Sequence, residues 1–157
     1  MTKRAASLEA VLCYRNPDVV DRYVKDFGGA RREAELVFRA LLKWLYLASR
    51  SGPVSCFITS DLGKIDDMWH TFILFTPAYT AFCGEQFGRY LHHQPLTGRE
   101  AKISATEERR RHRRYYELVY DILGEETFRE WFFSDRFKRN RGPWDASRSP
   151  KHRRGTA

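Results

Sequence analysis

The sequence predicts an all-α fold: a single compact bundle of five or six helices, followed by a disordered basic C-terminal tail. Apolar side chains recur at helical spacing in successive segments, and proline, glycine and capping residues separate those segments. No stretch reads as a confident strand. The 157 residues are 42% hydrophobic and 15% aromatic, enough for one domain with a substantial core. We assign residues 1–137 to this domain and residues 138–157 to the tail.

The first two predicted helices have clear ends. An Asn-Pro pair places a capping residue and an N-terminal proline at the start of a short helix over residues 17–27, which a Gly-Gly pair ends. Residues 31–49 form the next helix. Between positions 36 and 48 only Arg39 and Lys43 are polar, so we expect this helix to be buried at the centre of the bundle.

Two consecutive helices are predicted after residues 54–59, an apolar stretch too short to assign, and a turn at residues 60–63. The first has the apolar stripe of an amphipathic helix, formed by Ile65, Met68, Trp69, Phe72 and Ile73.

We expect Thr76 to cap the second of these helices, with Pro77 at its first position and its end before the Gln94-Pro95 pair. Ala81, Gly84 and Gly88 give it a small-residue face. Because an interior glycine costs roughly 1 kcal/mol relative to alanine, we expect another element to lie against that face.

The last two helices are predicted over residues 105–123 and 126–133, with Gly124 between them. The longer one carries a basic face that includes Arg110, Arg113 and Arg114. Such a face can contact phosphates, or it can be a solvated surface whose arginines pair with neighbouring glutamates. We favour the solvated surface, which is the usual role of a charge run on a helix.

Most of the formal net charge of +8 lies in the tail, where residues 138–157 contain seven Lys or Arg side chains and one Asp. Together with its prolines, glycines and serines, this composition cannot bury enough apolar surface to stay ordered. The rest of the chain is close to neutral. Composition therefore requires no folded nucleic-acid-binding face, although the tail can contact nucleic acid weakly.

The cysteines indicate a reducing compartment. Cys13, Cys56 and Cys83 are widely spaced, odd in number and without a CxxC motif, and we interpret the first two as core residues. The N-terminus lacks the continuous apolar segment of a signal peptide, and the longest apolar-rich stretch is too short to cross a membrane. We therefore expect a soluble, cytoplasmic protein with no membrane contact.

One stretch concentrates groups that can bind a metal. Asp66 and His70 stand one helical turn apart, and folding back of the second helix would bring Cys83, His92 or His93 towards them. Carboxylate, imidazole and thiol ligands suit zinc or iron. An aspartate four residues before a histidine serves equally well to fix a tautomer for proton transfer or to make a structural hydrogen bond.

Each of these candidate ligands also has a good explanation as a structural residue that binds no metal. Acidic side chains in a first helical turn and histidines in a last turn complement the helix dipole, and Cys83 among aromatic residues behaves as a small apolar side chain. Trp69 and Tyr79 fall on apolar stripes and are assigned mainly to the core. The sequence lacks HExxH, GxSxG and GxGxxG signatures, so common hydrolase and nucleotide-binding sites gain no support.

The same stretch resembles a known family. Asp66, Trp69, His70, Tyr79 and Cys83, with one of the two histidines at 92 and 93, follow the D-x-x-W-H and Y-x-x-x-C pattern of the glycine-rich domain-containing protein-like domain and its small bacterial relatives. The resemblance implies shared motif residues and no particular activity. The larger plant members look like multi-domain regulatory proteins, whereas this chain has only ten glycines and no glycine-rich segment.

Together these observations predict a helical binding or interaction module that holds zinc or iron at Asp66, His70, Cys83 and His92 or His93. Its partner would be a protein or a small molecule. A metal-dependent enzyme using the same residues is the first alternative. The second is association with nucleic acid through the basic helix face and the tail.

Overall fold

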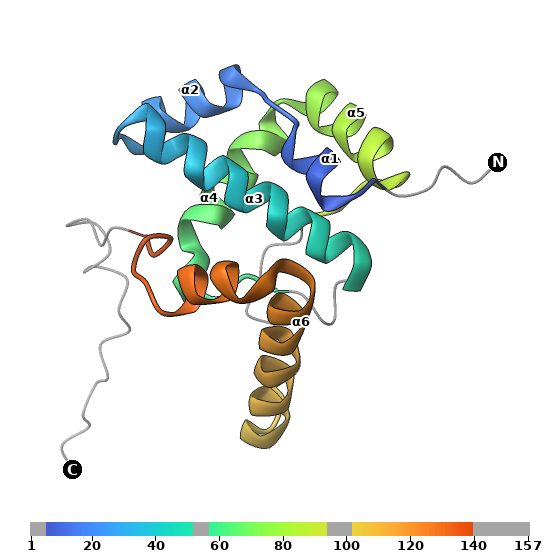
Figure 1. The fold of residues 1–157 in the computed structure, drawn as a ribbon. Helices are drawn as coiled ribbons and strands as arrows, with labels where there is room; N and C mark the ends of the chain where they lie inside the picture. The colour runs from blue at the N-terminus through green and yellow to red at the C-terminus, as the bar shows by residue number, and fades with distance from the viewer. Residues whose placement is uncertain (1–5, 52–56, 94–101, 140–157) are drawn as a thin grey trace, which may run out of the picture.

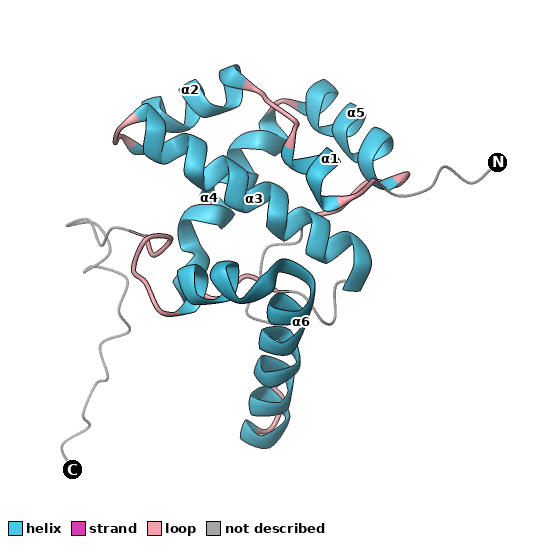
Figure 2. Ribbon diagram, in the orientation of Figure 1, coloured by secondary structure: helices cyan, strands magenta, loops and turns pink. Residues whose placement is uncertain are grey.

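Helices form all of the regular structure that is described. The computed structural model describes residues 6–51, 57–93 and 102–139, and these ranges contain no strand (Figure 2). The elements are α1 (Leu8–Leu12), α2 (Pro17–Phe27), α3 (Arg31–Ser51), the 3₁₀ helix η1 (Ser60–Leu62), α4 (Gly63–Leu74), α5 (Thr76–Phe87) and α6 (Ala105–Phe132). The predicted all-α fold is confirmed. None of these helices is both long and apolar enough to cross a membrane.

α3 lies at the centre of the molecule, as its nearly uninterrupted apolar sequence predicts. Leu41, Leu45 and Leu47 are fully buried, and α1, α2, α4 and α6 all contact this helix (Figure 1). Lys43 is only partly exposed and donates from Nζ to Thr127 Oγ1 of α6 at 2.9 Å. Burial lowers the pKa of Lys43. The lysine therefore ties the central helix to α6, while Arg39 remains exposed.

The N-terminal helices confirm one prediction and correct another. Asn16 caps α2 by accepting from the Val19 backbone N–H at 3.2 Å, and Pro17 is the first helical residue. α1 was not predicted, because five residues are too few to show a helical period. Cys13 was expected in the core but is exposed, since it sits at the C-cap of α1 while Val11 takes the buried position. Cys56 lies outside the described residues.

The ends of α5 differ from the prediction. Phe75 rather than Thr76 occupies the N-cap position, no side chain makes a capping bond there, and Pro77 lies in the first turn. α5 ends at Phe87 because Gly88 adopts a φ of 70°, in the left-handed region that glycine enters most easily. The chain thus leaves the helix before the Gln94-Pro95 pair, which lies outside the described ranges.

The small-residue face of α5 is uncovered by any described residue. A Cβ atom added to Gly84 would have no neighbour within 4 Å, and Ala81 and Gly88 are exposed. The helix instead buries the side that carries Tyr79 and Phe82. The expectation that another element packs against the glycines is therefore wrong for this part of the chain.

α6 is bent, and the bend matches the predicted break. Gly124 has non-helical dihedrals of φ 87° and ψ 165°, which separate a long projecting segment from a short one lying against the core (Figure 1). Trp131 in the short segment is fully buried. The two predicted helices are thus two arms of α6.

After α6 the chain returns to the start of α4. The Lys64 backbone N–H donates to the Phe137 carbonyl at 2.9 Å, and the Phe137 side chain is 1% exposed. Lys138 contacts Asp61 at 3.5 Å, and Arg139 reaches α4. Residues 138 and 139, which the sequence analysis assigns to the tail, thus contact η1 and α4. The rest of the predicted tail lies outside the described residues.

Candidate metal centre

Three of the predicted ligands converge on one side of α4. Asp66, His70 and His93 each offer one ligand atom, and these atoms lie within 4.8 Å of one another. His93 Nε2 is 3.0 Å from Asp66 Oδ1, and His70 Nδ1 is 3.7 Å from the same oxygen. The His70 and His93 rings lie 4.2 Å apart between centroids. The cluster therefore combines two imidazoles and one carboxylate from two separate segments.

The helical spacing explains how Asp66 and His70 meet. Residues four apart stand one above the other on a helix, and His70 Nδ1 also approaches the Asp66 backbone carbonyl at 2.7 Å. Because a carbonyl oxygen only accepts, Nδ1 carries the hydrogen of this bond. The bond holds the imidazole beside the carboxylate and leaves Nε2, rather than Nδ1, as the nitrogen that can bind a metal, while 52% of the His70 side chain stays exposed.

A buried hydrogen-bond chain places the segment that carries His93. Trp69 Nε1 donates to the Tyr79 hydroxyl at 2.9 Å, and that hydroxyl donates to the Leu91 carbonyl at 2.7 Å. The Trp69 ring then contacts the His93 ring, with 4.3 Å between centroids. Trp69 and Tyr79, which we assigned mainly to the core, thus also orient a candidate ligand two residues beyond Leu91.

Cys83 and His92 are not part of the cluster. Cys83 is fully buried, and burial raises the pKa of its thiol. The thiol therefore belongs to the core rather than to the cluster. His92 is exposed and packs on Tyr90, with ring centroids 4.8 Å apart.

The helix-dipole interpretation holds for Asp66 at the start of α4 but not for the two histidines after α5. Asp66 does lie in the first turn of α4, where an acidic side chain is favoured. The histidines at 92 and 93, however, follow α5 by several residues, because Gly88 ends that helix early. Their positions therefore cannot be explained as a complement to a helix C-terminus.

Arg139 completes the surroundings of the carboxylate, and sequence reasoning missed it. Its Nη2 lies 2.8 Å from Asp66 Oδ2 and 2.7 Å from Asp67 Oδ1, and its Nε contacts Asp67 at 2.9 Å. These contacts raise the pKa of Arg139. One oxygen of Asp66 thus faces an arginine, while the other faces the two histidines.

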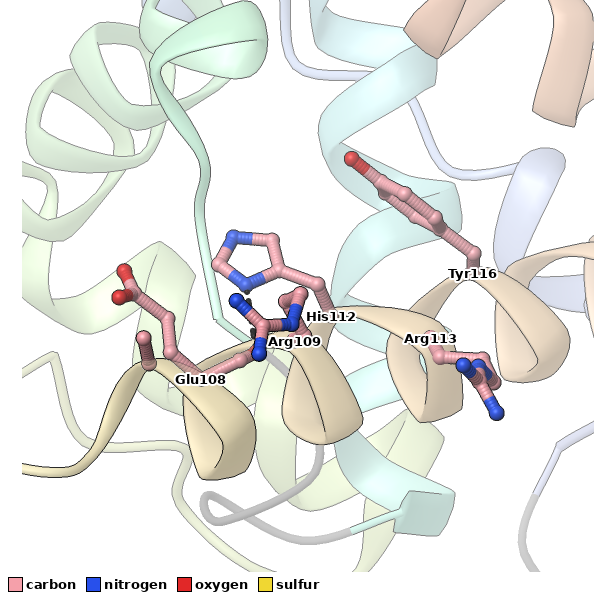
Figure 3. A pocket seen from close by; sticks show the side chains of 6 residues that line it. Glu108, Arg109, His112, Arg113 and Tyr116 are labelled. Atoms are coloured by element: carbon pink, nitrogen blue, oxygen red, sulfur yellow. Dashed lines mark hydrogen bonds between the residues drawn. The ribbon is translucent and has the colours of Figure 1, made fainter.

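The basic face of α6 is a separate, solvated surface. Arg110, Arg113 and Arg114 are exposed, and Arg110 approaches Glu107 at 4.0 Å, one of the expected glutamate pairs. A cavity of about 490 Å³ on this helix is lined by Ala105, Glu108, Arg109, His112, Arg113 and Tyr116 (Figure 3). All six side chains come from α6, so no second element of the described chain walls the cavity.

Removing the Tyr79 hydroxyl tests the buried chain. We expect Tyr79→Phe to lower the free energy of unfolding by about 1–3 kcal/mol, because Trp69 Nε1 loses its acceptor and the Leu91 carbonyl its donor. Tyr90→Phe is the matched control, since this neighbouring ring is 38% exposed. Urea unfolding compares the two variants, and equal stabilities would contradict the role given to Tyr79.

Substitution of Gly63 tests the position of the Arg139 side chain. Gly63 has ordinary helical dihedrals, yet a Cβ there would lie 2.6 Å from Arg139 Cγ. Gly63→Ala should therefore destabilise the native chain, but should stabilise an Arg139→Ala background by up to about 1 kcal/mol through helix propensity. A double-mutant cycle by urea unfolding measures the change of sign. The same effect of Gly63→Ala in both backgrounds would show that Arg139 does not lie there.

The Asp66 carboxyl makes stability depend on pH. Burial acts to raise its pKa, but the hydrogen bond with His93 and the charges of His70, His93 and Arg139 lower it below the ordinary 3.8. A carboxyl with a depressed pKa stabilises the fold above its unfolded-state pKa, and this contribution is lost as the pH falls through the folded-state pKa.

We therefore expect Asp66→Asn to be less stable than the native chain at neutral pH, with the difference shrinking between about pH 4 and pH 2. Asp121→Asn, at an exposed position on α6, serves as the control. Unfolding midpoints across this range measure the effect. A difference between the native chain and Asp66→Asn that stays constant with pH would rule out the proposed linkage.

Comparison with known proteins identifies the family of this chain. Neither the curated proteins nor the solved structures yield a match to the chain. Residues 12–120 match a family model, a span that includes α2 to α5, every residue of the cluster and most of the long arm of α6. The description of that family states no activity. The chain belongs to the UCP032817-like family.

Proposed function

We propose that this protein is a helical binding module that holds a divalent metal ion, zinc or iron, at Asp66, His70 and His93. The observation that carries the proposal is the convergence of three ligand atoms within 4.8 Å, with His93 contributed by a different segment from the other two. Two helix-surface residues one turn apart meet often. His93, in contrast, lies 23 residues after His70 in the sequence, and a buried hydrogen-bond chain orients its segment. Such a long-range convergence indicates a binding site more strongly than a neighbouring pair on one helix does.

The donor set suits the proposed ions. Two imidazoles and one carboxylate leave coordination positions open, as in catalytic zinc sites and in the facial triad of non-haem iron. Arg139 would orient the carboxylate through its second oxygen, the part that outer hydrogen-bonding groups play around bound metals. The exposed side of His70 gives the site access to solvent.

The binding role is favoured over the enzyme built on the same residues. A metal ion with an open position can activate water, so catalysis is chemically available. A substrate also needs a concave surface beside the metal. Two cavities formed by described residues, of about 490 Å³ and 400 Å³, are lined by other side chains, and neither of the two includes a candidate ligand.

We also propose that the motif relates this family to the glycine-rich domain-containing protein-like domain. The support is local. Trp69 and Tyr79 share the buried hydrogen-bond chain, Cys83 is buried in the same core cluster, and Asp66 and His70 lie on the same helix as Trp69. The spacing of the motif thus corresponds to one physical unit, which would be inherited together.

Metal titration with two adjacent histidine variants tests the proposal. Purified protein, stripped with a chelator, is titrated with zinc chloride in a calorimeter, and bound metal is counted by elemental analysis. We expect one ion per native chain and per His92→Asn chain, and loss of stoichiometric binding in His93→Asn and His70→Asn, since both remove a ligand. His92 is the matched control because it neighbours His93 but lies outside the cluster.

Thermal unfolding gives a second measurement of zinc binding that does not depend on the titration. An ion that binds only the folded state stabilises it, by about 2.7 kcal/mol at a free concentration of 100 times Kd. The native chain should therefore unfold at a higher temperature with zinc, and His93→Asn should not. No stoichiometric uptake by the native chain, or equal loss of zinc binding in His92→Asn and His93→Asn, would contradict the metal site.

A further inference from the structure

A second concave site lies away from the metal cluster, where the chain enters α2 and passes over α3. It has a volume of about 400 Å³ and is walled by residues of the segment before α2, of α2 itself and of α3. α2 and α3 are in contact, so the walls belong to the packed body of the molecule (Figure 1). The volume falls within the range of about 300–1,000 Å³ that is typical of small-molecule sites.

The inner wall of this cavity is apolar. Val20 is 4% exposed, Phe38 4% and Leu42 1%, so these side chains present only small areas at the bottom of the cavity. Leu36 and the ring of Tyr14 are partly exposed and form its sides. A ligand that fills the cavity must therefore have an apolar body.

The rim is strongly cationic. Arg15, Arg31, Arg32 and Arg39 line the cavity, against the single acidic side chain of Glu35. A cationic ligand would meet repulsion here, and a neutral one would leave Arg32 and Arg39 without an anionic partner. The charge at the rim favours an anion.

Two of the arginines are already engaged. Arg31 pairs with Asp21 and, at 3.2 Å, with Glu35. Arg15 donates from Nη1 to the Leu12 carbonyl at 2.6 Å and to the Tyr14 carbonyl at 2.9 Å. These bonds fix both side chains in place and use much of their capacity.

Arg32 and Arg39 are the available pair. Within the described residues neither has an ion pair or a hydrogen-bonding partner, and both line the cavity. They are seven residues apart on α3, so they lie on the same face, two turns from one another. A guanidinium binds carboxylate or phosphate through two parallel hydrogen bonds, which makes an unpaired arginine at a cavity rim well suited to such a group.

We propose that this cleft binds a small amphipathic organic anion, whose carboxylate or phosphate group pairs with Arg32 and Arg39 while its apolar body lies against Phe38, Leu36 and Val20. The proposal is independent of the metal site, because the two share no residue. Bare phosphate would leave the apolar wall uncovered, and a nucleic-acid strand would need an extended groove rather than a cavity of this volume. The combination of wall and rim selects a ligand with both parts.

Decanoate and decyl phosphate are the probes, and decan-1-ol, decyltrimethylammonium and acetate are the controls. Binding to the chelator-stripped full chain is measured by calorimetry below the micelle-forming concentration of each compound. We expect both anionic probes to bind one per chain, and decanol, the decyl cation and acetate each to bind at least tenfold more weakly. Similar affinities for decanoate, decanol and the cation would show a non-specific apolar surface and overturn the proposal.

Charge-matched variants locate the site. Arg32→Gln with Arg39→Gln should weaken decanoate binding at least tenfold, whereas Arg110→Gln with Arg114→Gln, which removes the same charge from the exposed face of α6, should leave it within twofold. All four positions are exposed, so the variants should fold, and thermal unfolding checks this. Equal weakening in both pairs would show that net charge alone attracts the probe, and no weakening in the first pair would place its site elsewhere.

Discussion

The arrangement of the candidate site depends on one buried hydroxyl. Tyr79 accepts a hydrogen bond from Trp69 of α4 and donates one to the backbone carbonyl of Leu91, so it joins two helices and the segment that follows them. Burial raises the pKa of Tyr79, which keeps the hydroxyl protonated and able to donate. Together with burial of the Leu91 side chain, this link holds the chain beyond Gly88 against α4, where His93 meets Asp66.

The surroundings of Asp66 follow from that link. One carboxylate oxygen faces His93, and the other faces Arg139, which lies in the segment after α6. Two segments far apart in the sequence therefore meet at a residue in the first turn of α4. The ion pair with Arg139 keeps the carboxylate charged and oriented, and the two imidazoles define the open side where an ion would bind. The cationic cleft at α3 uses none of these groups and is a separate binding surface.

Sequence reasoning was reliable where the signal was periodic. The apolar run of α3, the Asn-Pro start of α2 and the break at Gly124 were predicted, because each reflects a local preference of the backbone or of burial. The predicted end of α5, just before the Gln94-Pro95 pair, is wrong, because Gly88 adopts a left-handed conformation and ends the helix several residues earlier than the proline would. The same error places the two histidines in the last turn of a helix.

Arg139 had no sequence signal beyond its membership of a basic run. Its place beside Asp66 follows from the return of the chain after α6, a long-range contact that no local pattern encodes.

The central claim is that an ion would be bound by two imidazoles and a carboxylate, with Cys83 excluded. X-ray absorption spectroscopy of the zinc-loaded native chain tests this most directly, because nitrogen and oxygen ligands lie at about 2.0–2.1 Å and sulfur at about 2.3 Å. We predict that only nitrogen and oxygen atoms coordinate the zinc, with the outer scattering of two imidazole rings. A sulfur ligand, or a shell without imidazole scattering, would contradict it.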